Sequence, residues 1–134
     1  MPVTKGIEKL IAEAKTEIDT ISTEEAIAEL GNDKVVFIDI RDVRELEREG
    51  TIEGSHHAPR GMLEFWFDPA SPYHREAFGD DSNTYVLFCQ SAWRSVLATK
   101  TLKDMGLDNV KHFDGGFKGW KEAGGPVVEF SRKK

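Results

Sequence analysis

The sequence predicts an α/β domain of three layers, in which helices cover both faces of a central parallel sheet of about five strands. Two observations lead to this prediction. Short apolar runs without polar alternation recur along the 134 residues, as expected for strands buried on both faces. Segments with helical spacing separate these runs about five times, which is the order typical of strand-helix units in a parallel sheet.

A helix with one apolar face is expected at the start of the chain. Its apolar residues recur at helical spacing: Ile7, Leu10, Ile11, Ala14 and Ile18. Lys and Glu residues of both signs occupy the other faces, so we expect the apolar stripe to pack on the domain and not on a membrane. The sequence thus predicts an N-terminal helical extension at residues 1–19 and one domain at residues 20–130.

The other expected elements follow in chain order. Ser22 and Glu25 form the capping box of a helix that runs to about residue 30, and Asp42 and Glu45 cap a short helix that ends near Gly50. Strands are expected at residues 35–38, 56–59, 85–88 and 110–113, a helical turn at 61–67, an irregular segment at 68–83, and helices after residues 92 and 114.

Composition and motifs exclude several classes of function. The formal net charge of −6 argues against an extended nucleic-acid surface, and no apolar run reaches the roughly 20 residues of a membrane span. Phosphate-loop and dinucleotide-binding motifs are absent, and the four histidines do not follow metal-ligand spacing. Nothing in the first thirty residues resembles a signal peptide. We therefore expect a cytoplasmic protein without a metal or cofactor.

The only cysteine, Cys89, lies where a buried strand meets a helix N-terminus. Unpaired amides and the helix dipole favour an anion there, and a thiol so placed loses its proton more readily. Ligands of parallel sheets bind beyond the carboxyl ends of the strands, where Asp39 is also expected. These features predict that Cys89 is a nucleophile. Because the chain has no second cysteine, an outside acceptor must discharge any covalent intermediate.

Three stretches, found in order over residues 20–127, resemble signatures of the rhodanese family. Residues 89–95, Cys-Gln-Ser-Ala-Trp-Arg-Ser, resemble its active-site loop, which commonly has the pattern Cys-x-x-Gly-x-Arg-Ser. Residues 36–60 contain Asp39 and Arg41 followed by Glu45, Gly50, Ile52, Gly54, His57, Pro59 and Arg60, and resemble a second signature. Residues 114–120, Asp-Gly-Gly-Phe-Lys-Gly-Trp, resemble the closing one.

The resemblance implies a sulfurtransferase in which Cys89 and Arg94 are catalytic. Cys89 would take the outer sulfur of thiosulfate or a similar small anionic donor, carry it as a persulfide, and pass it to cyanide, a thiol or a protein thiol. Arg94 would orient the donor or brace the loop. Gln90, Ser91, Ala92 and Trp93 would form the rim that selects the donor, and Ser95 would cap the helix or bind the sulfur. A monomer or weak homodimer is expected.

Two further features of the resemblance bear on loop geometry and on the core. Ala92 stands where the family usually has glycine, and if this position requires a positive φ, alanine costs roughly 1 kcal/mol or reshapes the loop. We expect Asp39 and Arg41 to be structural, forming ion pairs and hydrogen bonds near the strand end.

Two other classes of function compete with the sulfurtransferase. A phosphatase or arsenate reductase uses the same fold and a similar loop, but Cys89 and Arg94 enclose four residues, whereas the related cysteine phosphatases enclose five. The tighter ring suits a sulfur atom better than a tetrahedral phosphate. A non-catalytic interaction module, with the first helix as its contact surface, is disfavoured by the intact loop.

Overall fold

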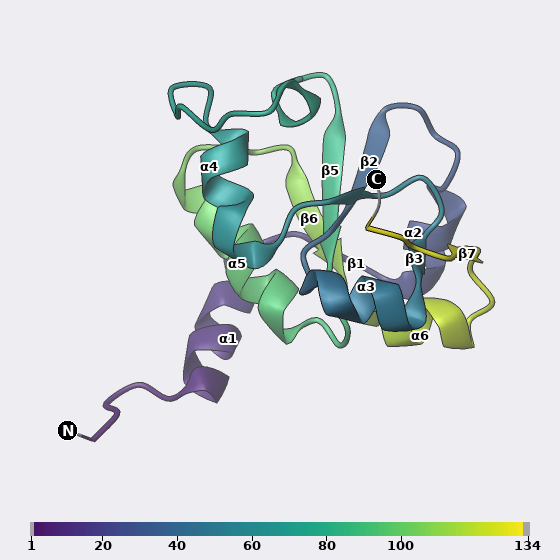
Figure 1. The fold of residues 1–134 in the computed structure, drawn as a ribbon. Helices are drawn as coiled ribbons and strands as arrows, with labels where there is room; N and C mark the ends of the chain where they lie inside the picture. Colours follow the sequence, from purple (N-terminus) through teal and green to yellow (C-terminus); the bar gives the residue numbers. More distant parts are fainter. Residues whose placement is uncertain (1, 133–134) are drawn as a thin grey trace.

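A computed structural model describes residues 2–132 and confirms the three-layer α/β class (Figure 1). Five strands form the central sheet in the order β1-β6-β5-β2-β4, and every neighbouring pair is parallel. The register places Asp39 at the end of β2 directly opposite Phe88 at the end of β5. These strands are β1 (Thr20–Ile21), β2 (Val35–Asp39), β4 (His56–His57), β5 (Thr84–Phe88) and β6 (Val110–Phe113).

Three short strands lie outside the predicted runs. β1 extends the central sheet beside β6, and a second, two-stranded antiparallel sheet joins β3 (Thr51–Ile52) to β7 (Val127–Val128). Each of these strands is two residues long, which is too short to carry a period-two pattern of side chains. Their pairing therefore depends on the fold that brings the distant segments together.

The helices cover both faces of the sheet, as predicted. Tyr85 and Leu87 contribute to the core beneath α4 and α5, whereas Val86 and Phe88 contribute to the core beneath α2 and α6. Successive residues of β5 thus point to opposite faces, which is why the strand is apolar without alternation. The helices are α1 (Ile7–Lys15), α2 (Thr23–Ala28), α3 (Val43–Glu49), α4 (Leu63–Phe67), α5 (Trp93–Asp104) and α6 (Gly116–Glu122), with 3-10 turns at Arg60–Met62 and Glu76–Phe78.

The predicted N-terminal helix is present and lies against α5 (Figure 1). Ile11 and Ala14 of α1 are buried with Val96 of α5, whereas Ile7 and Leu10 are 49% and 41% exposed. The helix ends at Lys15, so Ile18, the last residue of the predicted apolar stripe, lies outside it. The boundary between residues 1–19 and the domain stays a prediction, and residue 1 lies outside the described residues.

Both predicted capping boxes are present, and they set the starts of α2 and α3. The Ser22 hydroxyl accepts a hydrogen bond from the Glu25 amide, and the Glu25 side chain accepts one from the Ser22 amide. Asp42 and Glu45 form the same kind of capping box at the start of α3. Gly50 ends α3 with φ +83°, and a Cβ there would lie 2.6 Å from the Val128 carbonyl oxygen. Only glycine combines this conformation with so close an approach to β7.

Within residues 2–132, no helix combines the length and the hydropathy that crossing a membrane would require.

Candidate functional site

Cys89 follows β5 directly and precedes a short loop that enters α5. Its Sγ accepts a hydrogen bond from the Ser95 amide at 3.4 Å, in the first turn of α5. The residue is 1% exposed. The thiol therefore lies beneath the loop at the helix N-terminus, and the loop residues Ser91 and Trp93 are exposed to solvent.

Ala92 adopts the left-handed backbone conformation that the family's usual glycine would favour. Its φ is +83°, and no other non-glycine residue between 2 and 132 has a positive φ. This conformation costs an L-residue about 1 kcal/mol. Two donors hold the Ala92 carbonyl in place, namely the Val96 amide at 2.9 Å and the Ser95 hydroxyl at 3.0 Å. The loop thus keeps its turn despite the missing glycine.

The start of α6 holds the other side of the loop. The Phe117 amide donates to the Cys89 carbonyl at 2.8 Å, and the Lys118 amide donates to the Gln90 carbonyl at 3.1 Å. Gly116 has φ +64°, and a Cβ there would lie 2.5 Å from the Gln90 carbonyl oxygen. The closing Asp-Gly-Gly-Phe signature therefore serves the loop, because only glycine allows α6 to approach it.

Asp39 and Arg41 form a fully buried ion pair, as predicted. The Asp39 carboxylate accepts from Arg41 Nε at 3.0 Å and Nη2 at 2.8 Å, and from the Thr51 hydroxyl at 2.7 Å. Arg41 Nη1 also donates to Gln90 Oε1 at 3.2 Å, and the guanidinium lies 4.2 Å from the centre of the Phe117 ring. Gln90 is thereby tied to the buried ion pair, and its place in a rim that selects the donor stays a prediction.

Arg94 lies against α3. Its two terminal nitrogens donate to the Glu45 carboxylate at 2.7 and 3.0 Å. These hydrogen bonds lower the pKa of Glu45 and raise the pKa of Arg94. Of the two roles left open by the sequence, this geometry matches the bracing one.

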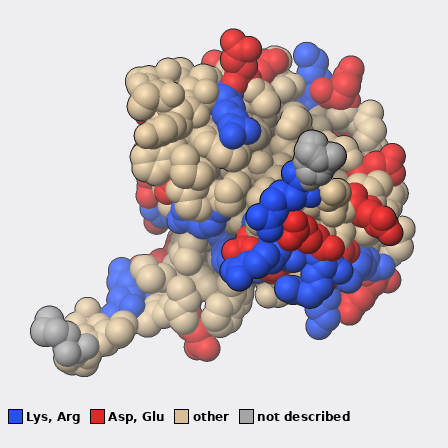
Figure 2. Space-filling view, in the orientation of Figure 1, with Lys and Arg blue, Asp and Glu red and all other residues tan. Residues whose placement is uncertain are grey.

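Arginines lie beside all four acidic residues on and next to α3. Figure 2 shows Lys and Arg side chains mixed with Asp and Glu side chains on this face. Each of the four carboxylates lies within salt-bridge distance of an arginine: Asp42 of Arg44, Glu45 of Arg94, Glu47 of Arg132 and Glu49 of Arg48. The acidity of α3 is therefore offset next to the loop.

Sequence reasoning assigned no role at the site to His112, because it treated the histidines as surface or core residues. His112 on β6 is buried, its Nδ1 lies 3.1 Å from the Ser95 hydroxyl, and its Nε2 lies 2.9 Å from the Thr20 hydroxyl. The histidine on the expected strand 110–113 was the available signal. Burial lowers the pKa of His112 to about 4, so the ring is neutral near pH 7.

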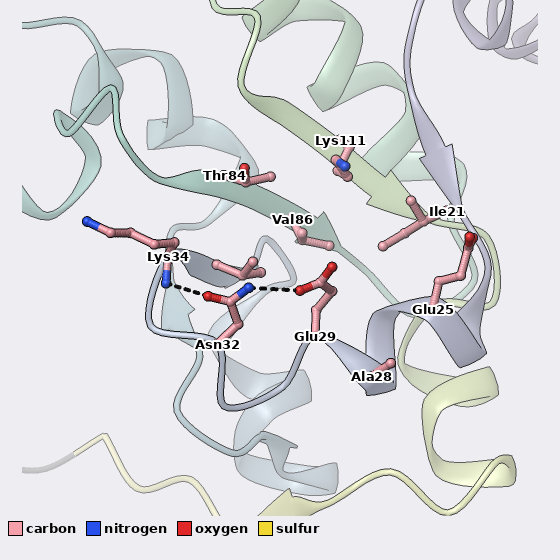
Figure 3. A pocket seen from close by; sticks show the side chains of 10 residues that line it. Ile21, Glu25, Ala28, Glu29, Asn32, Lys34, Thr84, Val86 and Lys111 are labelled. Carbon is pink, nitrogen blue, oxygen red and sulfur yellow. Dashed lines mark hydrogen bonds between the residues drawn. The ribbon is translucent and has the colours of Figure 1, made fainter.

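Four surface hollows in the described part of the chain are lined by residues other than Cys89. One of about 470 Å³ opens at the amino ends of β2, β5 and β6, and its lining includes Ile21, Val86, Lys34 and Lys111 (Figure 3). Asn32 at this hollow is already hydrogen-bonded to Glu29 and to the Lys34 amide. Among residues 2–132, no group of three His, Cys, Asp or Glu side chains could hold a metal ion.

The chain belongs to the rhodanese-like domain family, whose model matches residues 22–123. Two curated relatives are similar over the same part. An uncharacterized protein from Synechocystis sp. is 32% identical over 97 residues, and a putative mitochondrial thiosulfate sulfurtransferase from Schizosaccharomyces pombe is 26% identical over 96 residues. These matches cover 72% and 69% of this chain, and 49% and 67% of the relatives, so the chain spans about half of the Synechocystis protein.

Two solved structures are similar over almost the whole chain. A protein of unknown function from Rhodopseudomonas palustris, described as a possible tyrosine phosphatase, has a TM-score of 0.91 and 47% identity, with coverage of 96% of this chain and 98% of that one. The polysulfide-sulfur transferase homodimer from Wolinella succinogenes has a TM-score of 0.71 and 30% identity, with coverage of 92% and 87%.

The buried ion pair makes a prediction for stability. Arg41→Met leaves the Asp39 carboxylate buried without its partner. We therefore expect the free energy of unfolding, measured by urea titration, to fall by about 3–5 kcal/mol. Arg44→Met is the matched control, because its ion pair with Asp42 is exposed to solvent, so we expect a much smaller loss in this variant. Equal losses in the two variants would contradict a structural role for Arg41.

His112 makes a prediction for pH dependence. Its pKa is about 4 in the fold and 6.5 when unperturbed, so the unfolded chain binds the proton first as the pH falls. The free energy of unfolding should therefore decrease by about 2 kcal/mol between pH 7.5 and pH 5 on account of this residue. Urea titrations at the two pH values measure the change. His112→Asn should flatten the dependence, and an unchanged slope in that variant would refute the assignment.

Proposed function

We propose that this protein is a sulfurtransferase that carries a sulfane sulfur on Cys89. The observation that carries the proposal is the position of the Cys89 sulfur at the N-terminus of α5, where the Ser95 amide donates to it. Amides and a helix dipole stabilise the negative charge of a thiolate and of a persulfide. The proposed reaction uses no histidine base, and the His112 ring is hydrogen-bonded to Ser95 and Thr20.

The reaction has two displacement steps. In the first step, the Cys89 thiolate attacks the outer sulfur of thiosulfate, a sulfur-sulfur bond forms, and sulfite leaves with the electron pair of the broken bond. In the second step, cyanide or a thiolate attacks the terminal sulfur of the persulfide and leaves as thiocyanate or as a new persulfide. The Cys89 thiolate is regenerated, and no further oxidant or reductant enters.

Each predicted site residue has a proposed part in this reaction. Arg94 braces the loop through Glu45, and Ser95 holds the sulfur through its amide, whereas its hydroxyl binds the Ala92 carbonyl. Ala92 supplies the left-handed turn. The exposed loop residues Ser91 and Trp93 meet the donor, and Gln90, held by Arg41, lines its path.

The named relatives support a sulfane donor. The Schizosaccharomyces pombe protein is a putative thiosulfate sulfurtransferase, and the Wolinella succinogenes protein is a polysulfide-sulfur transferase. The latter is a homodimer, which agrees with our proposal of a monomer or weak homodimer. A cytoplasmic location and residues 20–130 as the unit of activity complete the proposal.

A phosphatase is the second candidate, because the similar Rhodopseudomonas palustris protein is described as a possible tyrosine phosphatase. Cys89 and Arg94 enclose only four residues, and Arg94 is occupied by Glu45. Both features disfavour a tetrahedral phosphate in this loop. A non-catalytic module is disfavoured by the ordered thiol at the helix N-terminus.

The intact mass of the protein after incubation with thiosulfate tests the proposal. We expect a gain of one sulfur atom, its loss on addition of cyanide with release of thiocyanate, and no gain in Cys89→Ser. Wild-type protein that takes up no sulfur from thiosulfate or polysulfide would refute the sulfurtransferase. In that case, cleavage of an aryl phosphate indicates the phosphatase, and failure in both assays indicates the interaction module.

Arg94→Ala should lower kcat/KM with thiosulfate about tenfold, because the loop loses its tie to α3. The free energy of unfolding should change by less than about 1 kcal/mol, since the ion pair is partly exposed. Glu45→Gln is the comparison variant, because it removes the bracing charge but keeps Arg94. Equal losses in the two variants support bracing, a loss in Arg94→Ala alone supports direct contact with the donor, and unchanged kinetics in both would remove Arg94 from the site.

A further inference from the structure

His112 is a buried titratable residue that the proposed reaction does not use. It lies on β6, and the parallel register places it opposite Thr20 of β1. Its ring joins two hydroxyl groups, with Nε2 2.9 Å from Thr20 Oγ1 and Nδ1 3.1 Å from Ser95 Oγ. Ser95 is also the residue whose amide contacts the Cys89 sulfur at 3.4 Å. Ser95 thus lies between the His112 ring and the Cys89 sulfur and contacts both.

Only one arrangement of protons satisfies all the contacts of a neutral ring. The Ser95 hydroxyl lies 3.0 Å from the Ala92 carbonyl oxygen, a contact between two oxygens that requires the serine proton. The proton between Ser95 Oγ and His112 must then be on Nδ1. The neutral ring has no other proton, so Nε2 accepts from the Thr20 hydroxyl.

This chain of hydrogen bonds ends on the strained part of the loop. Ala92 has φ +83°, and its carbonyl receives the Ser95 proton. With His112 donating to Ser95 Oγ, the serine hydroxyl cannot rotate to donate its proton elsewhere without leaving a 3.0 Å contact between two oxygen atoms. The Ser95 side chain therefore fixes the Ala92 carbonyl, and the Ser95 amide stays free for the sulfur.

We propose that His112 is a positioning residue for the Cys89 loop, acting through Ser95, with Thr20 setting the tautomer of its ring. The test by sulfur loading rests on the proposed function, whereas the test by alkylation of Cys89 does not. His112 does not touch the sulfur. Its role is to hold the left-handed turn at Ala92, where most members of the family rely on the conformational freedom of glycine.

Sulfur loading in single-turnover reactions with thiosulfate, followed by intact mass, tests the kinetic role. His112→Phe removes both ring nitrogens and should lower the limiting rate about tenfold at an unchanged half-saturating thiosulfate concentration. His112→Asn keeps a donor near the place of Nδ1 and should recover most of the rate. Equal rates in wild type and His112→Phe, or no recovery in His112→Asn, would overturn the proposal.

Alkylation by iodoacetamide gives a readout that does not depend on sulfur transfer, because Cys89 is the only cysteine of the chain. We expect alkylation to be fastest in the wild type, slower in His112→Asn and slowest in His112→Phe. If wild-type protein takes up no sulfur but shows this order, the proposed function fails and the positioning role stands. If loading proceeds but all three alkylate and load equally, the positioning role fails and the function stands.

A second pair of variants applies if His112→Phe does not fold. Thr20 is exposed at the outer end of the chain of hydrogen bonds, so its substitution spares the core. Thr20→Val removes the proton that Nε2 accepts and should slow both loading and alkylation about threefold, because the other tautomer then competes. Thr20→Ser keeps the hydroxyl and should retain the wild-type rates. Identical rates in the two variants would refute the role of the ring tautomer.

Discussion

The buried guanidinium of Arg41 is the group on which the geometry of the site depends. An unpaired charge in the interior costs several kcal/mol, and Arg41 avoids this cost by pairing with Asp39 at the end of β2. The same group donates to the Gly50 carbonyl that ends α3, binds Gln90 of the loop, and stacks on Phe117 of α6. The edge of the sheet, the end of α3, the loop and α6 therefore keep one arrangement relative to one another.

Cys89 lies in a loop that is held from three directions. Amides of α6 bind two of its carbonyl groups, Glu45 of α3 binds Arg94, and His112 of β6 fixes Ser95. These contacts offset the left-handed turn at Ala92, which an alanine does not favour. The consequence is that the Cys89 sulfur faces the Ser95 amide at the N-terminus of α5.

Long elements and local caps were predictable because their signals lie within a few residues of one another. The capping boxes at Ser22 and Asp42 are present as predicted, and so is the strand 110–113. The first helix ends three residues before Ile18, so the apolar stripe that predicted this helix extends beyond its end. The pairing of β1, β3 and β7 was not predicted, because two residues carry no periodic signal and their partners are distant in the chain.

The sequence by itself determined the α/β class, the family, the place of Cys89 between a strand and a helix, and the four residues between Cys89 and Arg94. These properties are local or follow from the order of motifs along the chain. Only the tertiary structure decided that Arg94 binds Glu45 and that His112 joins Thr20 to Ser95. These partners lie 49, 92 and 17 residues apart, and parallel register and helix packing, which no local pattern records, bring them together.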